Sequence, residues 1–361
     1  MKKAARTHLH TVAAGALALG LGAGLAAPAQ ADTLNFNMTT PWAAGHWLDF
    51  GAGRFAELVE ILTDGRVNIT VFPGGTLGSV LEVTQTVQSG VAEVGHAWGG
   101  YDWGQDRTGG IVGGWAGGLT PEETIMWLFM GDGEGARLVR EWRAERFNVV
   151  SVPCGIVETE IFLHSHQPVR TLEDFDGMRV RTAGSWAEIA PRLGATTVTM
   201  PGSEVFGALE RRVVDAIEWS GPGLNLASGF HTVAEYIITP GIHQPSGVHE
   251  CIFNPAAWDR ISERDQKLIE LAGQLTTHEV FMHYAQNDLL AFDEYISGEG
   301  NTIIQLEDSF IEAAMEAANA WATEQAGNDE WFARIYESQS AFQEKVSRWG
   351  EFRLPIGQSG N

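Results

Sequence analysis

Positive charge is scarce in this 361-residue chain, which has 23 Lys and Arg residues against 46 Asp and Glu residues and a net charge of −23. A surface with this excess of acid repels nucleic acid and anionic lipid, so neither is an expected partner. The same surface repels a free carboxylate at long range. A binding site for an anion therefore requires a local cluster of cations.

Cysteine is almost absent as well, with Cys154 and Cys251 widely separated in the sequence. This spacing gives no information on whether the two side chains meet. A chain of this length also buries enough surface to fold without a covalent cross-link. We interpret the two residues as buried thiols, and a disulfide in an oxidising compartment is the alternative.

Common catalytic signatures are missing, including Gly-x-Ser-x-Gly, His-Glu-x-x-His, Cys-x-x-Cys and the phosphate-binding loop. Glu158 and Glu160 would suit the acid/base pair of a secreted hydrolase, and this stays open as an alternative. Nothing else in the sequence supports that chemistry. We therefore expect a binding protein without catalytic residues.

The first 31 residues have the pattern of a secretory signal peptide. Lys2, Lys3 and Arg6 precede a charge-free stretch over residues 11–27, and Ala29-Gln30-Ala31 matches a cleavage site after Ala31. The stretch is rich in glycine and too weakly apolar for a membrane-spanning helix. Removing it changes the charge count to 20 − 46 = −26. We expect a periplasmic protein whose mature chain does not insert into the membrane.

Strand and helix patterns alternate along the mature chain. Apolar residues have helical spacing over residues 55–62, and a strand pattern follows over residues 67–71. A helix near residues 80–87 and a strand over residues 91–97 continue the series. A second alternating unit extends to about residue 218, and residues 262–348 are nearly all helical. The alternation predicts an α/β fold with mainly parallel sheets.

Three segments resemble the solute receptors of TRAP (tripartite ATP-independent periplasmic) transporters. They are Phe72-Pro73-Gly74-Gly75-Thr76-Leu77-Gly78, Leu172-Glu173-Asp174-Phe175-Asp176-Gly177-Met178-Arg179-Val180-Arg181 and Ala208-Leu209-Glu210-Arg211-Arg212-Val213-Val214-Asp215-Ala216. The resemblance covers most of the mature chain. It implies a two-lobed periplasmic-binding-protein fold with a cleft between the lobes and long bracing C-terminal helices. On this basis residues 32–155 and about 245–290 form lobe I, and residues 156–244 and about 291–361 form lobe II with the C-terminal helices.

The resemblance also implies a site. The arginine that grips the ligand carboxylate in the family corresponds to Arg181, and its guanidinium suits bidentate binding. Glu218 and Trp219 match a pair that lies at the ligand in the branch for 2-oxo and 2-hydroxy acids. In that branch the pair helps to hold Na⁺ or Ca²⁺. Glu158 stands roughly where a glutamine of the cation site is expected, so Glu158, Glu218 and Trp219 are the candidate metal ligands.

Aromatic rings are expected to line the rest of the cleft, and the candidates are Trp42, Trp47, Trp98, Tyr101, Trp103, Trp186 and Trp219. The segment His243-Gln244-Pro245-Ser246 is expected to add polar contacts. The expected ligand is a small carboxylate, preferably a 2-oxo or 2-hydroxy monocarboxylic acid, with no required cofactor beyond a possible Ca²⁺ or Na⁺. The expected partners are TRAP membrane permease subunits. A receptor for another anionic solute, such as an amino-acid-like or sugar acid, is the alternative.

Overall fold

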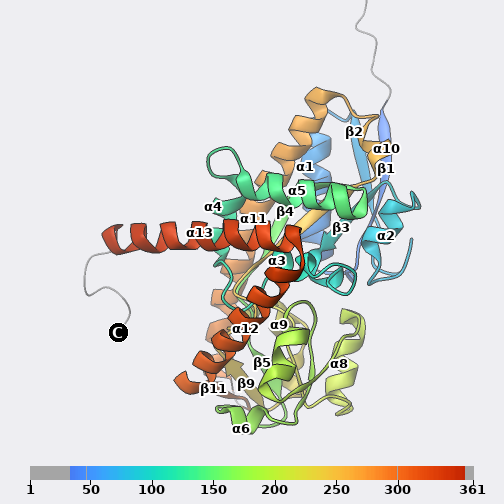
Figure 1. Ribbon diagram of the computed structural model, residues 1–361. Helices are drawn as coiled ribbons and strands as arrows, with labels where there is room; N and C mark the ends of the chain where they lie inside the picture. The colour runs from blue at the N-terminus through green and yellow to red at the C-terminus, as the bar shows by residue number, and fades with distance from the viewer. Residues whose placement is uncertain (1–32, 46, 299, 354–361) are drawn as a thin grey trace, which may run out of the picture. The chain divides into compact units, whose positions relative to one another are not determined.

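The computed structural model describes residues 33–45, 47–298 and 300–353, so the predicted signal peptide and its cleavage site lie outside the described residues. Two β-sheets, each with helices packed against it, make up the described chain (Figure 1). This arrangement confirms the predicted α/β class.

The first sheet has the strand order β2-β1-β3-β10-β4. Its strands are β1 (Leu34–Thr39), β2 (Val67–Val71), β3 (Val94–Trp98), β4 (Val150–Val157) and β10 (Gly247–Phe253). Strand β1 pairs in parallel with β2 and β3, whereas β10 runs antiparallel to β3 and β4.

The second sheet has the order β11-β9-β5-β8-β6-β7. Its strands are β5 (Leu163–Ser165), β6 (Arg179–Arg181), β7 (Thr196–Val198), β8 (Ala216–Ile217), β9 (Tyr236–Thr239) and β11 (Thr302–Gln305). Strand β5 is antiparallel to both β8 and β9. Both sheets are therefore mixed, and the prediction of mainly parallel sheets is only partly right.

The antiparallel strands arise where the chain passes between the sheets. Residues 158–162 lead from β4 to β5, and residues 240–246 return from β9 to β10. The two crossing segments touch closely. A Cβ added to Gly241 would lie 1.7 Å from the backbone oxygen of Glu160, so only glycine fits there.

The helices of the first half of the chain are α1 (Arg54–Leu62), α2 (Val83–Gln88), α3 (Thr108–Gly113), α4 (Pro121–Phe129), α5 (Glu134–Phe147), α6 (Leu172–Phe175) and α7 (Trp186–Ile189). Those that follow are α8 (Gly202–Glu210), α9 (Pro222–Ala227), α10 (Pro255–Trp258), α11 (Glu263–Ser297), α12 (Asp308–Asn328) and α13 (Glu330–Arg353). Short helical turns also occur at Trp47–Gly53 and Gly99–Tyr101.

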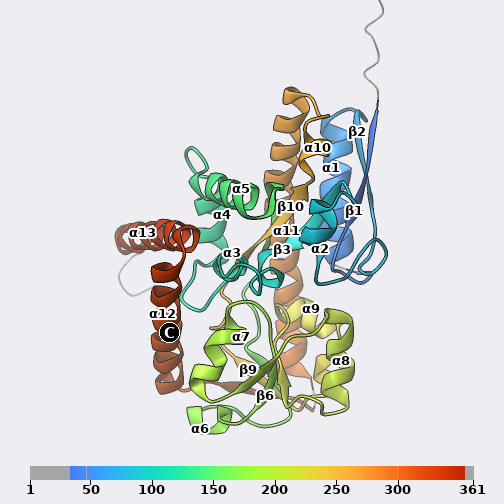
Figure 2. The same cartoon turned by 45° about the vertical axis from the view of Figure 1, so that its right-hand side comes forward.

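Helix α11 contacts elements of both sheets, since it packs against β4 and α1 and also against α9 (Figure 2). Ser262 caps its first turn by accepting a hydrogen bond from the Asp265 N–H. Strand β11 follows this helix and interrupts the predicted helical C-terminal region. Its three β-branched residues, Thr302, Ile303 and Ile304, pair in parallel with β9.

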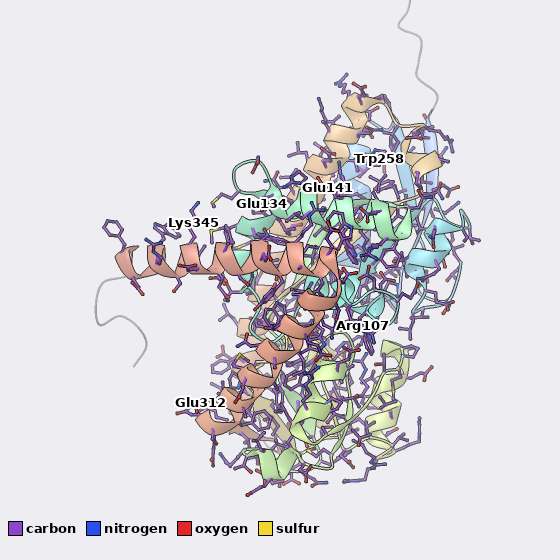
Figure 3. All side chains as sticks on the ribbon, viewed as in Figure 1. Arg107, Glu134, Glu141, Trp258, Glu312 and Lys345 are labelled. Atoms are coloured by element: carbon purple, nitrogen blue, oxygen red, sulfur yellow. A yellow bond between two sulfur atoms is a disulfide. The ribbon has the colours of Figure 1, made fainter. Side chains whose placement is uncertain are left out.

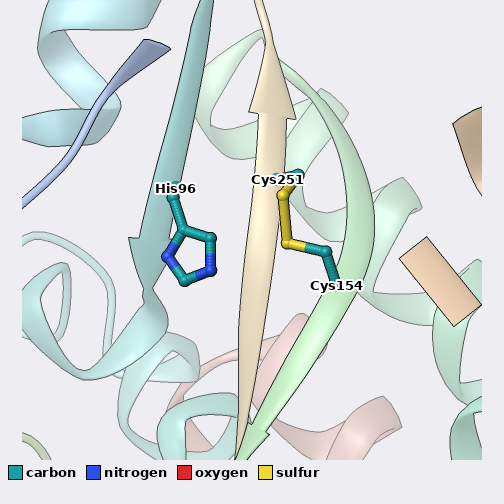
Figure 4. Close-up of side chains that lie close together, drawn as sticks. All are labelled: His96, Cys154 and Cys251. Carbon is teal, nitrogen blue, oxygen red and sulfur yellow. A yellow bond between two sulfur atoms is a disulfide. The ribbon is translucent and has the colours of Figure 1, made fainter. Parts of the chain in front are cut away.

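Cys154 and Cys251 form a disulfide between the neighbouring strands β4 and β10, with Cα atoms 5.7 Å apart. Our interpretation of two buried thiols is therefore wrong, because the two crossings of the chain bring these distant strands together. The His96 ring, on strand β3, lies beside the disulfide (Figure 4). All three side chains are fully buried.

Two polar contacts fix the loop that follows β3. The Arg143 guanidinium is fully buried and binds Asp102 (2.6 Å) and Glu250 (2.7 Å). Arg107, labelled in Figure 3, forms an ion pair with Glu188 on α7 at 2.7 Å. None of the described helices is both long enough and apolar enough to span a membrane.

Candidate anion-binding site

A small cavity lies where several strands end. Trp98, Val157 and Arg181 are the last residues of β3, β4 and β6, and Glu218 directly follows β8. Ligands of open α/β sheets bind beyond the carboxyl ends of the strands. The cavity volume is about 30 Å³, and by the same measure one water molecule needs about 10–15 Å³. Its walls are formed by Trp42, Trp47, Trp98, Tyr101, Val157, Glu160, Arg181, Glu218, Trp219, Ser220, Gln244 and His249.

Arg181 supplies the positive charge of the wall and is only 2% exposed. Its Nη1 donates to the carboxylate of Glu218 (2.9 Å) and to the Glu218 backbone carbonyl (3.0 Å), and Nη2 donates to the Met200 carbonyl (3.2 Å). Its Nε has no hydrogen-bond partner among the described residues. The N–H on Nε therefore remains available to an oxygen of a carboxylate, and the Tyr101 hydroxyl is a further hydrogen-bond partner of the guanidinium.

Arg179 lies two residues earlier on the same strand but has a different environment. Its side chain is half exposed and binds Asp215. Strand β6 begins at the surface with Arg179 and ends in the cavity wall with Arg181, so only Arg181 faces the cavity.

Glu160, Glu218 and His243 form a buried charge cluster next to Arg181. Nε2 of His243 lies 3.0 Å from Oε2 of Glu160 and 3.8 Å from Oε2 of Glu218. Burial alone would lower the pKa of His243, but the two carboxylates outweigh it and raise this pKa to about 9. His243 is therefore a second cation of the site, although it lies behind the cavity wall.

The pKa values of the two carboxyl groups in this cluster are shifted in opposite directions. Burial opposes ionisation of Glu218, but Arg181 and His243 outweigh it and lower the pKa of Glu218 to about 2. Burial and the neighbouring charge of Glu218 hold the pKa of Glu160 well above its usual range. An additional cation would therefore affect Glu160 more than Glu218, because it would lower the raised pKa of Glu160 and favour its ionised form.

Glu158 lies outside the cavity wall. Its Oε1 accepts hydrogen bonds from the Ser220 hydroxyl (2.7 Å) and the Gly221 N–H (3.1 Å), so it orients Ser220, which does line the cavity. Strand β4 ends at Val157, and the side-chain alternation of a strand does not extend to residues 158 and 160. This explains why the two glutamates, considered together from the sequence, have different environments.

The predicted aromatic residues Trp42, Trp98, Tyr101 and Trp219 all line the cavity. The Arg181 guanidinium lies 5.1 Å from the Trp219 ring, within the range of a cation–π contact. Burial raises the pKa of Tyr101, which keeps its hydroxyl protonated and able to donate. Trp47, another predicted aromatic residue, also lines the cavity, whereas the candidates Trp103 and Trp186 do not. Gln244 belongs to the segment predicted to add polar contacts, and Glu160 and His249 were not predicted as ligand contacts.

Glu160 and Glu218 are the two carboxylates best placed to hold a cation near the cavity, since their oxygens and Nε2 of His243 lie within 4.8 Å of one another. The protonated His243 would not itself be a ligand of this cation. Two carboxylates are hard oxygen donors of the kind that Na⁺ and Ca²⁺ accept. The oxygen donor beside Glu218 comes from Glu160, two residues beyond the predicted Glu158. Gln244 and His243 already hold the Glu160 oxygens at 2.7 and 3.0 Å and so orient this donor.

A buried arginine in a small cavity, with strands of two α/β sheets ending around it, is typical of periplasmic solute-binding proteins. The chain belongs to one family of that class, because the model of the family "Bacterial extracellular solute-binding protein, family 7" matches residues 38–328. Members bind solutes, so the protein is not an enzyme and the hydrolase alternative is set aside.

Similar proteins support the resemblance to TRAP receptors. A monocarboxylate 2-oxoacid-binding periplasmic protein of Nostoc is 27% identical over 316 residues, which cover 88% of this chain and 86% of the relative. A TRAP solute-binding protein of Pseudoalteromonas atlantica with bound sodium and pyruvate has a TM-score of 0.83 at 25% identity, covering 89% of this chain and 97% of that one.

A third similar protein, from Bordetella bronchiseptica, has calcium and picolinate in its active site. It has a TM-score of 0.83 at 26% identity, and the match covers 89% of this chain and 95% of that one. The fold of this chain matches those of the Pseudoalteromonas and Bordetella proteins, and it has the long C-terminal helices predicted from the sequence, α12 and α13. They bind a metal ion together with a carboxylate.

Proposed function

We propose that this protein is an exported receptor that captures a small 2-oxo or 2-hydroxy monocarboxylic acid and delivers it to TRAP permease subunits. The observation that carries the proposal is the buried Nε–H of Arg181, which has no partner among the described residues, in the wall of a cavity of about 30 Å³. One guanidinium edge matches one carboxylate. The small cavity favours an acid of few atoms over a sugar acid.

The polar wall opposite Arg181 suits the second oxygen of such a ligand. Tyr101 can donate a hydrogen bond, whereas the Ser220 hydroxyl already donates to Glu158 and can only accept one from a ligand hydroxyl. A cation held by Glu160 and Glu218 would accept a 2-oxo or 2-hydroxy oxygen as a ligand. Glu158 and His243 act from behind the wall by orienting Ser220 and Glu160. A plain fatty acid lacks that oxygen and would bind more weakly.

The division into lobes follows the crossings of the chain. We assign residues 32–155 and about 245–290 to lobe I, and residues 156–244 and about 291–361 to lobe II. The strands of the first and second sheets support this assignment, since the chain changes sheet after β4 and again before β10. Export to the periplasm fits the periplasmic relative from Nostoc, and the proposed cleavage after Ala31 rests on the sequence pattern.

The proposal is tested by thermal unfolding of the purified mature protein with pyruvate, lactate, acetate, alanine and glucuronate. A ligand present at 100 times its Kd adds about 2.7 kcal/mol to the unfolding free energy. We expect pyruvate or lactate to raise the Tm most and acetate to have a much smaller effect. A rise in Tm with glucuronate or alanine alone would show that the ligand is a sugar acid or an amino-acid-like solute instead.

A further inference from the structure

A second, larger cavity adjoins the anion cavity and has a volume of about 410 Å³. The two cavities share Trp42, Trp47 and Trp219, so these three rings separate them. Phe206, Leu224 and Phe230 contribute further apolar wall, from α8, α9 and the turn after α9 (Figure 2). We call this second cavity the apolar chamber.

The chemistry of the apolar chamber differs from that of the protein surface. Within the described part of the chain, no Asp, Glu, Lys, Arg or His side chain lines it, although the protein has 46 acidic residues. Apolar walls of this kind bind apolar groups, because such groups leave water on binding.

Trp219 connects the two cavities. Its ring lies 5.1 Å from the Arg181 guanidinium and also packs against Gly202, where an added Cβ would lie 2.0 Å from the ring. A carboxylate bound at Arg181 therefore starts beside Trp219, and a chain longer than that of pyruvate has to pass this ring. The chamber lies on the other side of it.

We propose that the apolar chamber binds the hydrocarbon tail of the ligand, so that the preferred ligands are 2-oxo acids with an extended apolar chain. This inference rests on the proposed function, since Arg181 has to hold the carboxylate end. The chamber volume accommodates several methylene groups beyond pyruvate. Each methylene that leaves water strengthens binding about fourfold.

Calorimetric titration with pyruvate, 2-oxobutanoate, 2-oxopentanoate, 2-oxohexanoate and 2-oxooctanoate tests the inference. We expect affinity to rise along the series by up to about fourfold per methylene. The heat-capacity change of binding should become more negative as the chain lengthens. Flat or falling affinity beyond pyruvate would overturn the inference while leaving the proposed function intact. If pyruvate also failed to bind, the proposed function itself would fall.

Substitutions in the chamber wall test whether the hydrocarbon tail of the ligand binds there. Ser203 is exposed on α8 and lines the chamber, so Ser203→Trp narrows it without touching the core. In this variant the longer 2-oxo acids should bind no more tightly than pyruvate, so that affinity no longer rises with chain length. The neighbouring Glu204→Trp is the matched control, because Glu204 is exposed and does not line the chamber. Ala227→Trp, at the end of α9, is a second blocking variant should Ser203→Trp fail to fold. If affinity still rose with chain length in a folded variant that blocks the chamber, the hydrocarbon tail would not bind in the apolar chamber.

Discussion

The imidazole of His243 lies against the carboxylate of Glu160, with Nε2 and Oε2 3.0 Å apart. Counting charges around this pair shows what a ligand needs. A cation beside Glu160 favours the ionised form of this group, whose pKa is otherwise raised by burial and by Glu218. With Glu160 ionised, Arg181 and His243 contribute two positive charges, and Glu160 and Glu218 contribute two negative charges. A bound monocarboxylate leaves one negative charge uncompensated in a buried cluster, where Coulomb energies are several kcal/mol.

One monovalent cation restores the balance, so we predict that Na⁺ is sufficient for tight binding of pyruvate. Calorimetry in NaCl and in N-methylglucamine chloride of equal ionic strength, both with EDTA, should show at least a tenfold weaker affinity without Na⁺. Glu160→Gln removes one negative charge and should abolish this dependence. Equal affinities in the two salts, with no metal found by elemental analysis, would rule out a cation at Glu160.

His243→Gln provides the complementary prediction. Without the imidazolium, the cluster with a bound carboxylate has two uncompensated negative charges instead of one. The variant should therefore bind pyruvate more tightly with Ca²⁺ than with Na⁺, whereas the wild type should gain little from replacing Na⁺ by Ca²⁺. Titrations of both proteins in each salt measure this preference. The same ion preference in both proteins would mean that His243 does not contribute to the charge balance.

The disulfide gives a prediction about stability alone. It closes a loop of 97 residues between Cys154 and Cys251, and removing a native disulfide usually costs about 2–5 kcal/mol. The double variant Cys154→Ala/Cys251→Ala should lose stability in this range in urea unfolding. Its pyruvate affinity should stay within twofold of the wild type, because neither sulfur lines the cavity. Unchanged unfolding after reduction of the wild type with dithiothreitol would contradict the expected contribution.

Arg143 is expected to be essential for stability. Its guanidinium is buried between Asp102 and Glu250, so Arg143→Met leaves two buried carboxylates without a cation. We expect a loss of about 3–5 kcal/mol in urea unfolding. Arg137→Met on the same helix is the control, since its exposed pair with Glu141 is worth only about 0.3–0.5 kcal/mol. Equal losses in the two variants would show that burial of the pair has no special effect.

The local patterns predicted much of the fold, because apolar periodicity reports which face of an element is buried. The short strand β11 was missed within the predicted C-terminal helical region, since four residues show no resolvable period. The disulfide depends on contacts between distant strands, and no local pattern encodes such contacts. The antiparallel pairings that make both sheets mixed also depend on contacts between distant strands, so local patterns did not predict them.

The site was predictable only in part for a related reason. The resemblance identified Arg181, Glu218 and Trp219 by their motifs. Glu160 differs, because its place in the cavity wall depends on the course of residues 158–162 after β4 ends. The pairing of Glu160 with His243 requires the two crossing segments to meet, which the sequence does not indicate.

The central claim is that Arg181 binds the ligand carboxylate, and calorimetric titration of pyruvate into Arg181→Lys tests it most directly. Lysine keeps the charge but cannot present two parallel N–H groups, and charge-assisted hydrogen bonds contribute about 1.5–3 kcal/mol each. We predict a 10- to 150-fold weaker Kd, about the ratio that this energy range gives. Arg179→Lys, from the exposed end of the same strand, should bind like the wild type. Wild-type affinity in a correctly folded Arg181→Lys protein would contradict the account.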